Sequence, residues 1–146
     1  LLLGSPDIKN RASIEREYLE DLDKKKVINW ISSKSKVLSY IQQSKIGILP
    51  SYREGFPKSL LESASCGLPL ISTNVSGCRE ICIDGHNGFL SKVKDPHDLA
   101  RVIEKLLFDR KSQLLMGRNS RKVCIEKFSD FEISSQFLKI YNIIKN

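Results

Sequence analysis

The sequence predicts an α/β fold, a parallel sheet with helices on both faces, and three observations support this. Short apolar runs alternate with amphipathic helical patterns along the 146 residues. The segments between successive runs are long enough for the crossovers that parallel strands need. The runs themselves are apolar enough to be buried on two sides, as parallel strands are. No linker or low-complexity segment divides the chain, so residues 1–146 are predicted to form one domain.

The first part of the chain carries the pattern of three strands and two helices. The strand segments are short and apolar, whereas the helical segments place apolar residues three and four positions apart. Pro50 closes the third strand, because proline cannot continue a strand ladder. In chain order we predict a strand at 1–4, a helix at 13–22, a strand at 27–31, a helix at 35–43 and a strand at 45–50.

The middle of the chain continues this alternation. We predict a helix from Lys58 to Cys66, followed by Gly67 in the position that favours a left-handed cap. A strand at 69–73 comes next. A further strand at 87–93 follows an Asn-Gly turn.

The last third is predicted to be helical, because its start signals are clear. Asp95 caps a helix whose first position is Pro96, and apolar residues then recur at helical spacing. A second helix is predicted at 112–126. A third opens with a capping box of Ser129 and Glu132. Its apolar stripe consists of Ile133, Phe137, Ile140, Tyr141 and Ile144.

The charge balance limits the classes of partner. The chain has 24 basic and 17 acidic residues, a net charge of +7, which attracts anions such as nucleotides, nucleic acid or an anionic membrane. The local clusters are 24–26 and a looser group of Arg118, Arg121 and Lys122. Few aromatic residues lie among these cations, which argues against nucleic acid. No apolar run approaches the roughly 20 residues of a membrane span, so none is predicted.

Cysteine and acidic residues give no metal or redox signal. The four cysteines, at 66, 78, 82 and 124, lack the C-x-x-C spacing of a redox pair or zinc site, and we predict reduced and largely buried thiols. A `DLD` sequence at 21–23 is similar to the metal-binding motif of some transferases. It ends a predicted helix before three lysines, so we interpret it as coincidence. No metal and no cofactor are predicted.

The stretch `PSYREGFPKSLLE`, residues 50–62, carries the functional signal. It follows a predicted strand, at the sheet edge where parallel α/β folds bind ligands. Gly55 and Pro57 shape the loop, and the free amides at Lys58, Ser59 and Leu60 begin a helix that suits a phosphate. Glu62 can accept hydrogen bonds from a ribose diol, and Glu54 from sugar hydroxyls. This layout predicts a nucleotide-sugar site, although two glutamates at this spacing also arise by chance.

The run from residue 50 to residue 100 resembles the carboxy-terminal, donor-binding domain of glycosyltransferase family 4, whose members have the GT-B fold. The glutamate pair, `CGLP`, `GCREI` and `DGHNGFL` recur in the family's order, and the match extends to the terminal helix. The form is most similar to bacterial transferases that assemble capsule, O-antigen or lipid-linked glycans. The resemblance therefore implies a Rossmann-like half of a GT-B enzyme and a retaining hexosyl or N-acetylhexosaminyl transfer from a UDP-sugar.

The resemblance also implies a role for each matching residue. Glu54 takes the catalytic position at the donor sugar, with Gly55, Phe56 and Pro57 approaching that sugar. Lys58, Ser59 and Leu60 meet the diphosphate, and Glu62 binds the ribose. The nucleobase rests near Trp30, Ile31 and Ser32, and residues 76–80 face the cleft.

The departures from the family define further expectations. The basic pair expected for the diphosphate and the amino-terminal acceptor domain are absent from these residues. We therefore expect a fragment that lacks its first βα unit, binds weakly and transfers no sugar alone. The expected acceptor is a glycan or lipid-linked molecule, and the expected location is cytoplasmic, with contact at the inner membrane face. The alternatives are a non-catalytic nucleotide-sugar-binding module and a dinucleotide oxidoreductase, but the latter needs a G-x-G-x-x-G that the chain does not have.

Overall fold

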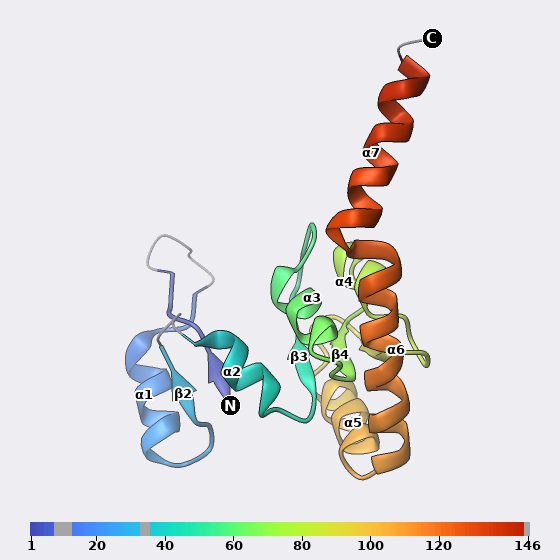
Figure 1. The fold of residues 1–146 in the computed structure, drawn as a ribbon. Helices are drawn as coiled ribbons and strands as arrows, with labels where there is room; N and C mark the ends of the chain where they lie inside the picture. Colours follow the sequence, from blue (N-terminus) through green and yellow to red (C-terminus); the bar gives the residue numbers. More distant parts are fainter. Residues whose placement is uncertain (8–12, 33–35, 145–146) are drawn as a thin grey trace. The chain divides into compact units, whose positions relative to one another are not determined.

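The structure is a computed structural model that describes residues 1–7, 13–32 and 36–144. It divides into two compact units, residues 1–40 and residues 41–146 (Figure 1). That residues 1–146 form one domain stays a prediction.

The first unit contains a small parallel sheet. Strand β1 (Leu2–Leu3) pairs in parallel with β2 (Trp30–Ile31), and helix α1 (Arg16–Lys24) lies between them in the chain. Leu19 is the buried residue of α1. Helix α2 (Val37–Gln42) follows and runs into the second unit. The helix predicted at 13–22 begins three residues later than expected, because the backbone of Glu15, with a ψ of 140°, is extended rather than helical.

The second unit is built on a three-stranded parallel sheet with the order β3-β4-β5. The strands are β3 (Gly47–Leu49), β4 (Leu70–Thr73) and β5 (Gly88–Ser91). In their register, Gly47 is paired with Leu70, and Leu70 with Gly88. Helices α3 (Lys58–Ser65) and α4 (Ser76–Ile81) lie in the two crossovers. The predicted parallel pairing is therefore confirmed.

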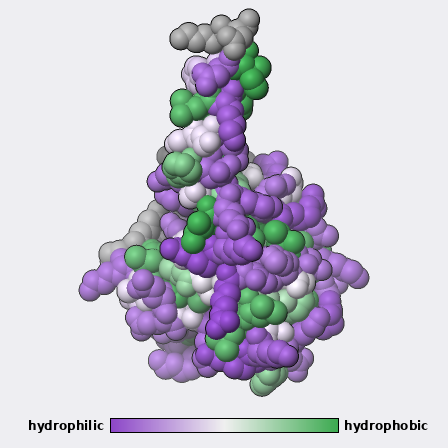
Figure 2. Space-filling view, turned by 45° about the vertical axis from the view of Figure 1, so that its right-hand side comes forward, coloured by the Kyte–Doolittle hydropathy of each residue, from purple (hydrophilic) through white to green (hydrophobic). Residues whose placement is uncertain are grey.

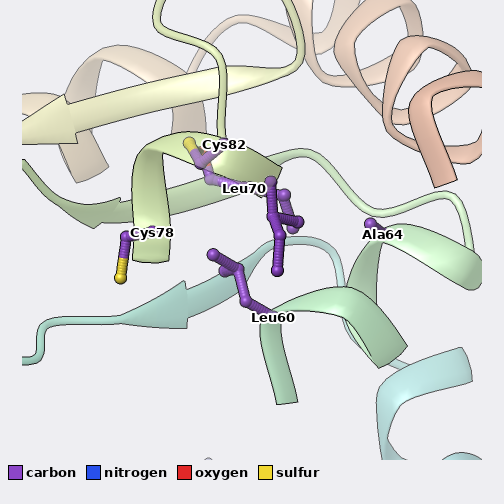
Figure 3. Close-up of a cluster of buried hydrophobic side chains, with 6 residues drawn as sticks. Leu60, Ala64, Leu70, Cys78 and Cys82 are labelled. Atoms are coloured by element: carbon purple, nitrogen blue, oxygen red, sulfur yellow. Dashed lines mark hydrogen bonds between the residues drawn. The ribbon is translucent and has the colours of Figure 1, made fainter. Parts of the chain in front are cut away.

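Side chains from β4 show that helices cover both faces of this sheet. Leu70 and Ile71 are consecutive and both fully buried, so they point to opposite faces. Leu70 packs in a cluster with Leu60 and Ala64 of α3 and with residues of α4 (Figure 3). Ile71 packs instead with side chains of helices α5 (Pro96–Leu107) and α6 (Arg110–Phe128). This arrangement confirms the predicted fold class.

Three helices complete the chain, namely α5 (Pro96–Leu107), α6 (Arg110–Phe128) and α7 (Asp130–Ile144). The Asp95 side chain accepts a hydrogen bond from the amide of Asp98 at 2.9 Å, which confirms the predicted cap before Pro96. The amide of Ser112 donates in the same way to Asp109 at 2.9 Å. This cap starts α6 two residues earlier than the sequence predicted.

Gly67 ends α3 as predicted, with a φ of +75°. The Gly67 amide donates to the carbonyl of Ala64, and the Leu68 amide to that of Ser63, which together form a Schellman motif. Gly117 of α6 lies against this cap, since a Cβ there would be 2.3 Å from the Gly67 carbonyl oxygen. The carboxyl end of α3 is thus packed directly against the middle of α6.

Three local expectations differ from the structure. Residues 76–81 form helix α4, which the sequence analysis did not predict. The turn before β5 is made by Gly85, with a φ of +73°, and not by the predicted Asn-Gly pair. Asn87 is instead fully buried, where its side chain donates to the carbonyl of Ile81 and accepts from the amide of Ile83. The capping box of α7 is half formed: the Glu132 amide donates to Ser129, but the Glu132 carboxylate accepts from Gln136.

Helix α7 is apolar on much of its exposed surface. The side chains of Phe131, Phe137 and Tyr141 are 83%, 60% and 71% exposed. Figure 2 shows hydrophobic side chains along this helix. The Ile144 side chain, which the predicted stripe included, lies outside the described residues. Within the part of the chain that the structure describes, the helices are too short or too polar to cross a membrane.

Candidate functional site

The loop after β3 is fixed by two hydroxyl groups of the neighbouring strand. The Ser72 hydroxyl donates to the carbonyl of Leu49 at 2.7 Å, and the Thr73 hydroxyl donates to the carbonyl of Ser51. Both side chains are buried at the carboxyl end of β4. Because β3 and β4 are parallel, the loops that follow them leave the sheet at the same edge. The segment 50–57 therefore starts from a defined position.

The middle of the loop lies against the start of α4. The Gly77 amide donates to the Glu54 carbonyl at 3.3 Å. A Cβ at Gly77 would lie 2.3 Å from the carbonyl oxygen of Gly55, which is too close for any side chain. The backbone of residues 54 and 55 is therefore held by direct contact with α4.

The negative charge of Glu54 acts on the buried thiol of Cys78. Burial raises the pKa of Cys78, hydrogen bonding with Ser72 opposes that rise, and the negative charge of Glu54 adds to it. Glu54 itself is half-buried. The first glutamate of the motif is thus fixed at its backbone and close to the core, rather than free in solvent.

Helix α3 begins with two free backbone amides. Pro57 is buried at the cap position, and its carbonyl accepts from the amides of Leu60 and Leu61 at 3.1 and 3.2 Å. The amides of Lys58 and Ser59 make no hydrogen bond within the described part of the chain. Of the three amides predicted to meet a diphosphate, two are therefore unpaired. Free amides at a helix start form an anion site, which the helix dipole reinforces.

Phe56 and Leu60 contribute their side chains to packing. The rings of Phe56 and Phe128 pack edge to face with centroids 5.3 Å apart, which connects the loop to the end of α6. The Leu60 side chain is 1% exposed and points into the cluster shown in Figure 3. The Leu60 side chain is therefore unavailable to a ligand, and its amide is already paired with the Pro57 carbonyl.

The two glutamates of the motif have unpaired carboxylates. Glu62 is half-buried in the second turn of α3. Among the described residues, neither Glu54 nor Glu62 makes an ion pair or a side-chain hydrogen bond. Since partly buried carboxylates usually have partners, two unpaired ones beside free amides indicate a site for a polar ligand.

The predicted nucleobase residues belong to the first unit. The Trp30 indole donates to the Gly4 carbonyl at 2.8 Å, and the Arg16 guanidinium lies 5.5 Å from its ring centroid. The Ser32 carbonyl accepts from the Ser5 hydroxyl at 2.5 Å. Ile31 pairs with Leu3 in the small sheet. The role of Trp30, Ile31 and Ser32 at a nucleobase stays a prediction.

The acidic residues of `DLD` have structural partners. Asp21 pairs with Lys25 at 2.6 Å, and Asp23 accepts from the Trp30 amide at 3.0 Å. All four cysteines are free thiols, with Cys78 and Cys82 buried and the other two half-buried. Over residues 1–7, 13–32 and 36–144, no group of three His, Cys, Asp or Glu side chains is placed to hold a metal ion.

The residues that hold the site in place were harder to predict from the sequence than the glutamates. Ser72 and Thr73 support the loop but were not predicted as site residues, whereas Gly77 was predicted only as part of the cleft-facing segment 76–80. One signal was available, because hydroxyl residues at the end of an otherwise apolar strand need a hydrogen-bond partner when they are buried. Gly77 gave only the weaker signal of a glycine within a short polar stretch.

Comparison with known proteins gives a consistent result. Residues 4–123 match the family model described as "Glycosyl transferases group 1". The "N,N'-diacetylbacillosaminyl-diphospho-undecaprenol alpha-1,3-N-acetylgalactosaminyltransferase" of Campylobacter jejuni is 30% identical over 100% of this chain and 38% of that protein. The "Capsular polysaccharide biosynthesis glycosyltransferase CapM" of Staphylococcus aureus is 30% identical over 97% of this chain and 37% of that protein. The chain thus spans less than two fifths of the length of these relatives.

Solved structures share the fold. A sucrose-phosphate synthase from Thermosynechococcus elongatus matches 98% of this chain and 37% of its own, with a TM-score of 0.81 and 24% identity. The Anabaena protein HepE, solved with UDP-glucose, matches 97% of this chain and 40% of its own, with a TM-score of 0.81 and 18% identity. The C-terminal domain of a glycosyl transferase group 1 family protein from Francisella tularensis matches 78% of this chain and 62% of its own, with a TM-score of 0.66 and 23% identity. These matches confirm the predicted half of a GT-B fold.

Proposed function

The chain belongs to the glycosyl transferases group 1 family, and we propose that it forms the donor-binding part of a retaining glycosyltransferase. The proposed donor is a nucleotide sugar with a uridine diphosphate carrier. The proposed acceptor is a glycan or lipid-linked molecule of surface polysaccharide synthesis. The names of two relatives support this acceptor class. The Campylobacter transferase is named for a diphospho-undecaprenol compound, and the Staphylococcus transferase for capsular polysaccharide biosynthesis.

One observation carries the donor proposal, namely two unpaired glutamates on either side of a helix start with two free amides. In this proposal the amides of Lys58 and Ser59 bind the diphosphate, Glu62 accepts the ribose hydroxyls, and Glu54 accepts those of the sugar. A carboxylate is suited to a diol because it offers two acceptor oxygens. The three groups occur in the same order as the parts of the ligand.

The chemical task of this part is to stabilise the leaving group. When the bond between sugar and diphosphate breaks, negative charge develops on the phosphate oxygens. Fixed amide hydrogens and the positive end of the α3 dipole stabilise that charge without moving, and the exposed Lys58 ammonium adds to the effect. Glu54 keeps the sugar in place while the acceptor attacks.

The same charges lead us to propose that transfer needs no metal ion. The helix start and Lys58 offer positive charge where another fold would place a divalent cation. Activity of the full-length enzyme is expected to survive treatment with EDTA. Loss of activity that magnesium or manganese restores would contradict this proposal.

We also propose that transfer takes place on the cytoplasmic side of the membrane and that residues 1–146 alone transfer no sugar. The relatives are more than twice as long as this chain, and the proposed acceptor site lies in the additional length. A sugar-transfer assay on the 146-residue chain should give no product. An assay on the full-length protein should give product.

Glu62→Ala in the full-length protein tests the donor proposal. A hydrogen bond to a charged group contributes about 1.5–3 kcal/mol, so UDP affinity should fall by about tenfold to a hundredfold in calorimetry. Glu104→Ala is the matched control, because Glu104 is exposed on α5 and belongs to another part of the unit. Equal affinities for the Glu62 variant and the control would remove Glu62 from the site.

A further inference from the structure

A cluster of positive charge lies at the amino ends of the strands of the three-stranded sheet, at the edge opposite to the proposed donor site. An open groove of about 550 Å³ is lined there by four cations, which are Lys45, Arg110, Arg118 and Arg121. Volumes of this size are typical of small-molecule sites. None of the described residues that line the groove is acidic. We call it the basic groove.

The topology separates the basic groove from the proposed donor site. Lys45 precedes β3, and Leu68 and Pro69, which also line the groove, precede β4. The loop of residues 50–57 follows β3, and α4 follows β4. Since the two strands are parallel, the groove and the loop lie at opposite edges of the sheet. Strands of three and four residues put about 10–13 Å between those edges.

Buried and backbone groups hold two of the arginines in place. The buried Gln113 donates to the carbonyls of Leu106 and Leu107, both at 2.9 Å, and its carbonyl oxygen accepts from Arg110 at 3.1 Å. Arg121 donates to the carbonyl of Ser65 at the end of α3. Each guanidinium keeps further N–H groups for a ligand. Two of the four cations are therefore held in fixed positions before any ligand binds.

The other two cations have no partner in the described part of the chain. Neither Lys45 nor Arg118 makes an ion pair or a side-chain hydrogen bond there. Asp109, beside Arg110, is occupied as the cap of α6, where both of its oxygens accept from Ser112. Four like charges around one groove repel one another, and an anion between them relieves that repulsion.

We propose that the basic groove binds a phosphate ester. Arginine pairs match the tetrahedral oxygens of phosphate, and Lys45 adds a point charge at the rim. The ester is either a soluble phosphorylated compound or the headgroup of an anionic phospholipid. The exposed side chains of Leu114 and Phe108 near Arg110 are compatible with either source. This site is independent of the proposed donor site.

Chemical modification of arginine tests the groove in the full-length protein. Inorganic phosphate is added before phenylglyoxal, and modification is read residue by residue by mass spectrometry. Phosphate should protect Arg110 and Arg118 more than the exposed Arg79 and Arg101, which serve as internal references. The same protection should be found in the Glu62→Ala protein, in which the proposed donor site is impaired. Protection of the groove can therefore be tested whether or not the donor proposal is correct. Equal protection of all four arginines would overturn the proposal.

A charge-matched pair of variants measures affinity. Lys45→Gln combined with Arg118→Gln removes two cations that have no structural partner, so the fold should be retained. Phosphate concentrations needed for protection of Arg110 should rise by about tenfold to a hundredfold. Lys122→Gln combined with Lys127→Gln removes the same charge from α6 outside the groove. This control should need the same phosphate concentration for protection of Arg110 as the unsubstituted protein. An equal effect in both variants would overturn the proposal.

Vesicles distinguish the two sources of phosphate. The protein and both variants are sedimented with vesicles of phosphatidylcholine, with and without phosphatidylglycerol. Binding to phosphatidylglycerol that only the groove variant loses supports a lipid headgroup. Protection by free phosphate without vesicle binding supports a soluble ester. Absence of both effects would overturn the proposal.

Discussion

The amide of Gly77 donates a hydrogen bond of 3.3 Å to the carbonyl of Glu54, and through it helix α4 holds the loop that carries the first glutamate of the motif. The contact leaves no room for a side chain, since a Cβ at Gly77 would lie 2.3 Å from the Gly55 carbonyl oxygen. The position of Glu54 therefore depends on a residue that comes 23 positions later in the chain.

Gly77→Ala should therefore displace the loop. A methyl group forced against backbone atoms costs about 1–3 kcal/mol of the free energy of unfolding, and UDP affinity should fall because Glu54 and Pro57 move together. Denaturant unfolding and calorimetry on the full-length protein measure the two effects. Gly55→Ala is the control for stability, because a Cβ at Gly55 meets no atom within 4 Å. A Gly77→Ala protein with unchanged stability would show that the contact is loose.

Lys58→Pro isolates the role of a single backbone hydrogen. Lys58 is the first residue of α3, a position where proline fits a helix, and the extended conformation of Pro57 suits a following proline. The substitution removes the free amide hydrogen, whereas Lys58→Ala removes only the side-chain charge. We expect UDP to bind about tenfold more weakly to Lys58→Pro than to Lys58→Ala, with similar unfolding curves. Equal affinities would exclude this amide from diphosphate binding.

Most of the fold could be predicted from the sequence, because its signals are local. The caps at Asp95 and Gly67 have the predicted geometry, and the apolar runs became parallel strands. Helix α4 could not be predicted in this way. It spans six residues, and its cap, Val75, makes no side-chain hydrogen bond, so packing against residues 54 and 55 determines it.

Only the ligand-facing parts of the site, the two glutamates and the helix start, could be predicted from the sequence. Two glutamates around a helix start are visible in the sequence, but the support from Ser72, Thr73 and Gly77 depends on which strands are neighbours. The basic groove shows the same limit. Arg118 and Arg121 are close in the chain, whereas Lys45 joins them only because β3 begins beside α6.

Alkaline pH should destabilise the second unit through Cys82. Burial raises the pKa of this thiol from 9.0 to about 12, with the charge of Asp84 as the next cause. The unfolded thiol loses its proton near pH 9, while the folded one keeps it, so stability is complete below pH 9 and falls between pH 9 and 12. At about 1.4 kcal/mol per pH unit, this contribution reaches about 4 kcal/mol.

Comparison with Cys82→Ala isolates that contribution from other groups that titrate in the same range. The free energy of unfolding of both proteins is measured by denaturant titration from pH 7 to about pH 11. The stability advantage of the unsubstituted protein over Cys82→Ala should shrink as the pH rises. Only the unsubstituted protein has the Cys82 thiol, so only it loses stability when that thiol is deprotonated in the unfolded state. Parallel curves would contradict the assignment.

The exposed apolar side chains of α7 should cause the 146-residue chain to self-associate. Phe137, Ile140 and Tyr141 are at least half exposed and lie within one and a half turns of the helix. Phe137→Ser combined with Ile140→Ser should lower the association constant in analytical ultracentrifugation. Ser134→Ala combined with Ser135→Ala is the control on the same helix. Equal sedimentation of all three proteins as monomers would contradict this prediction.

The two free amides at the start of α3 also bear on how this molecule tolerates random mutation. An amide hydrogen belongs to the main chain, so any single substitution at Lys58 or Ser59 other than proline preserves it. Saturation libraries at these two exposed positions should therefore contain many functional clones. Libraries at the buried Pro57 and Leu60, which orient the helix, should contain few. The buried side chains that orient the helix are thus expected to tolerate fewer substitutions than the exposed side chains whose amides are free.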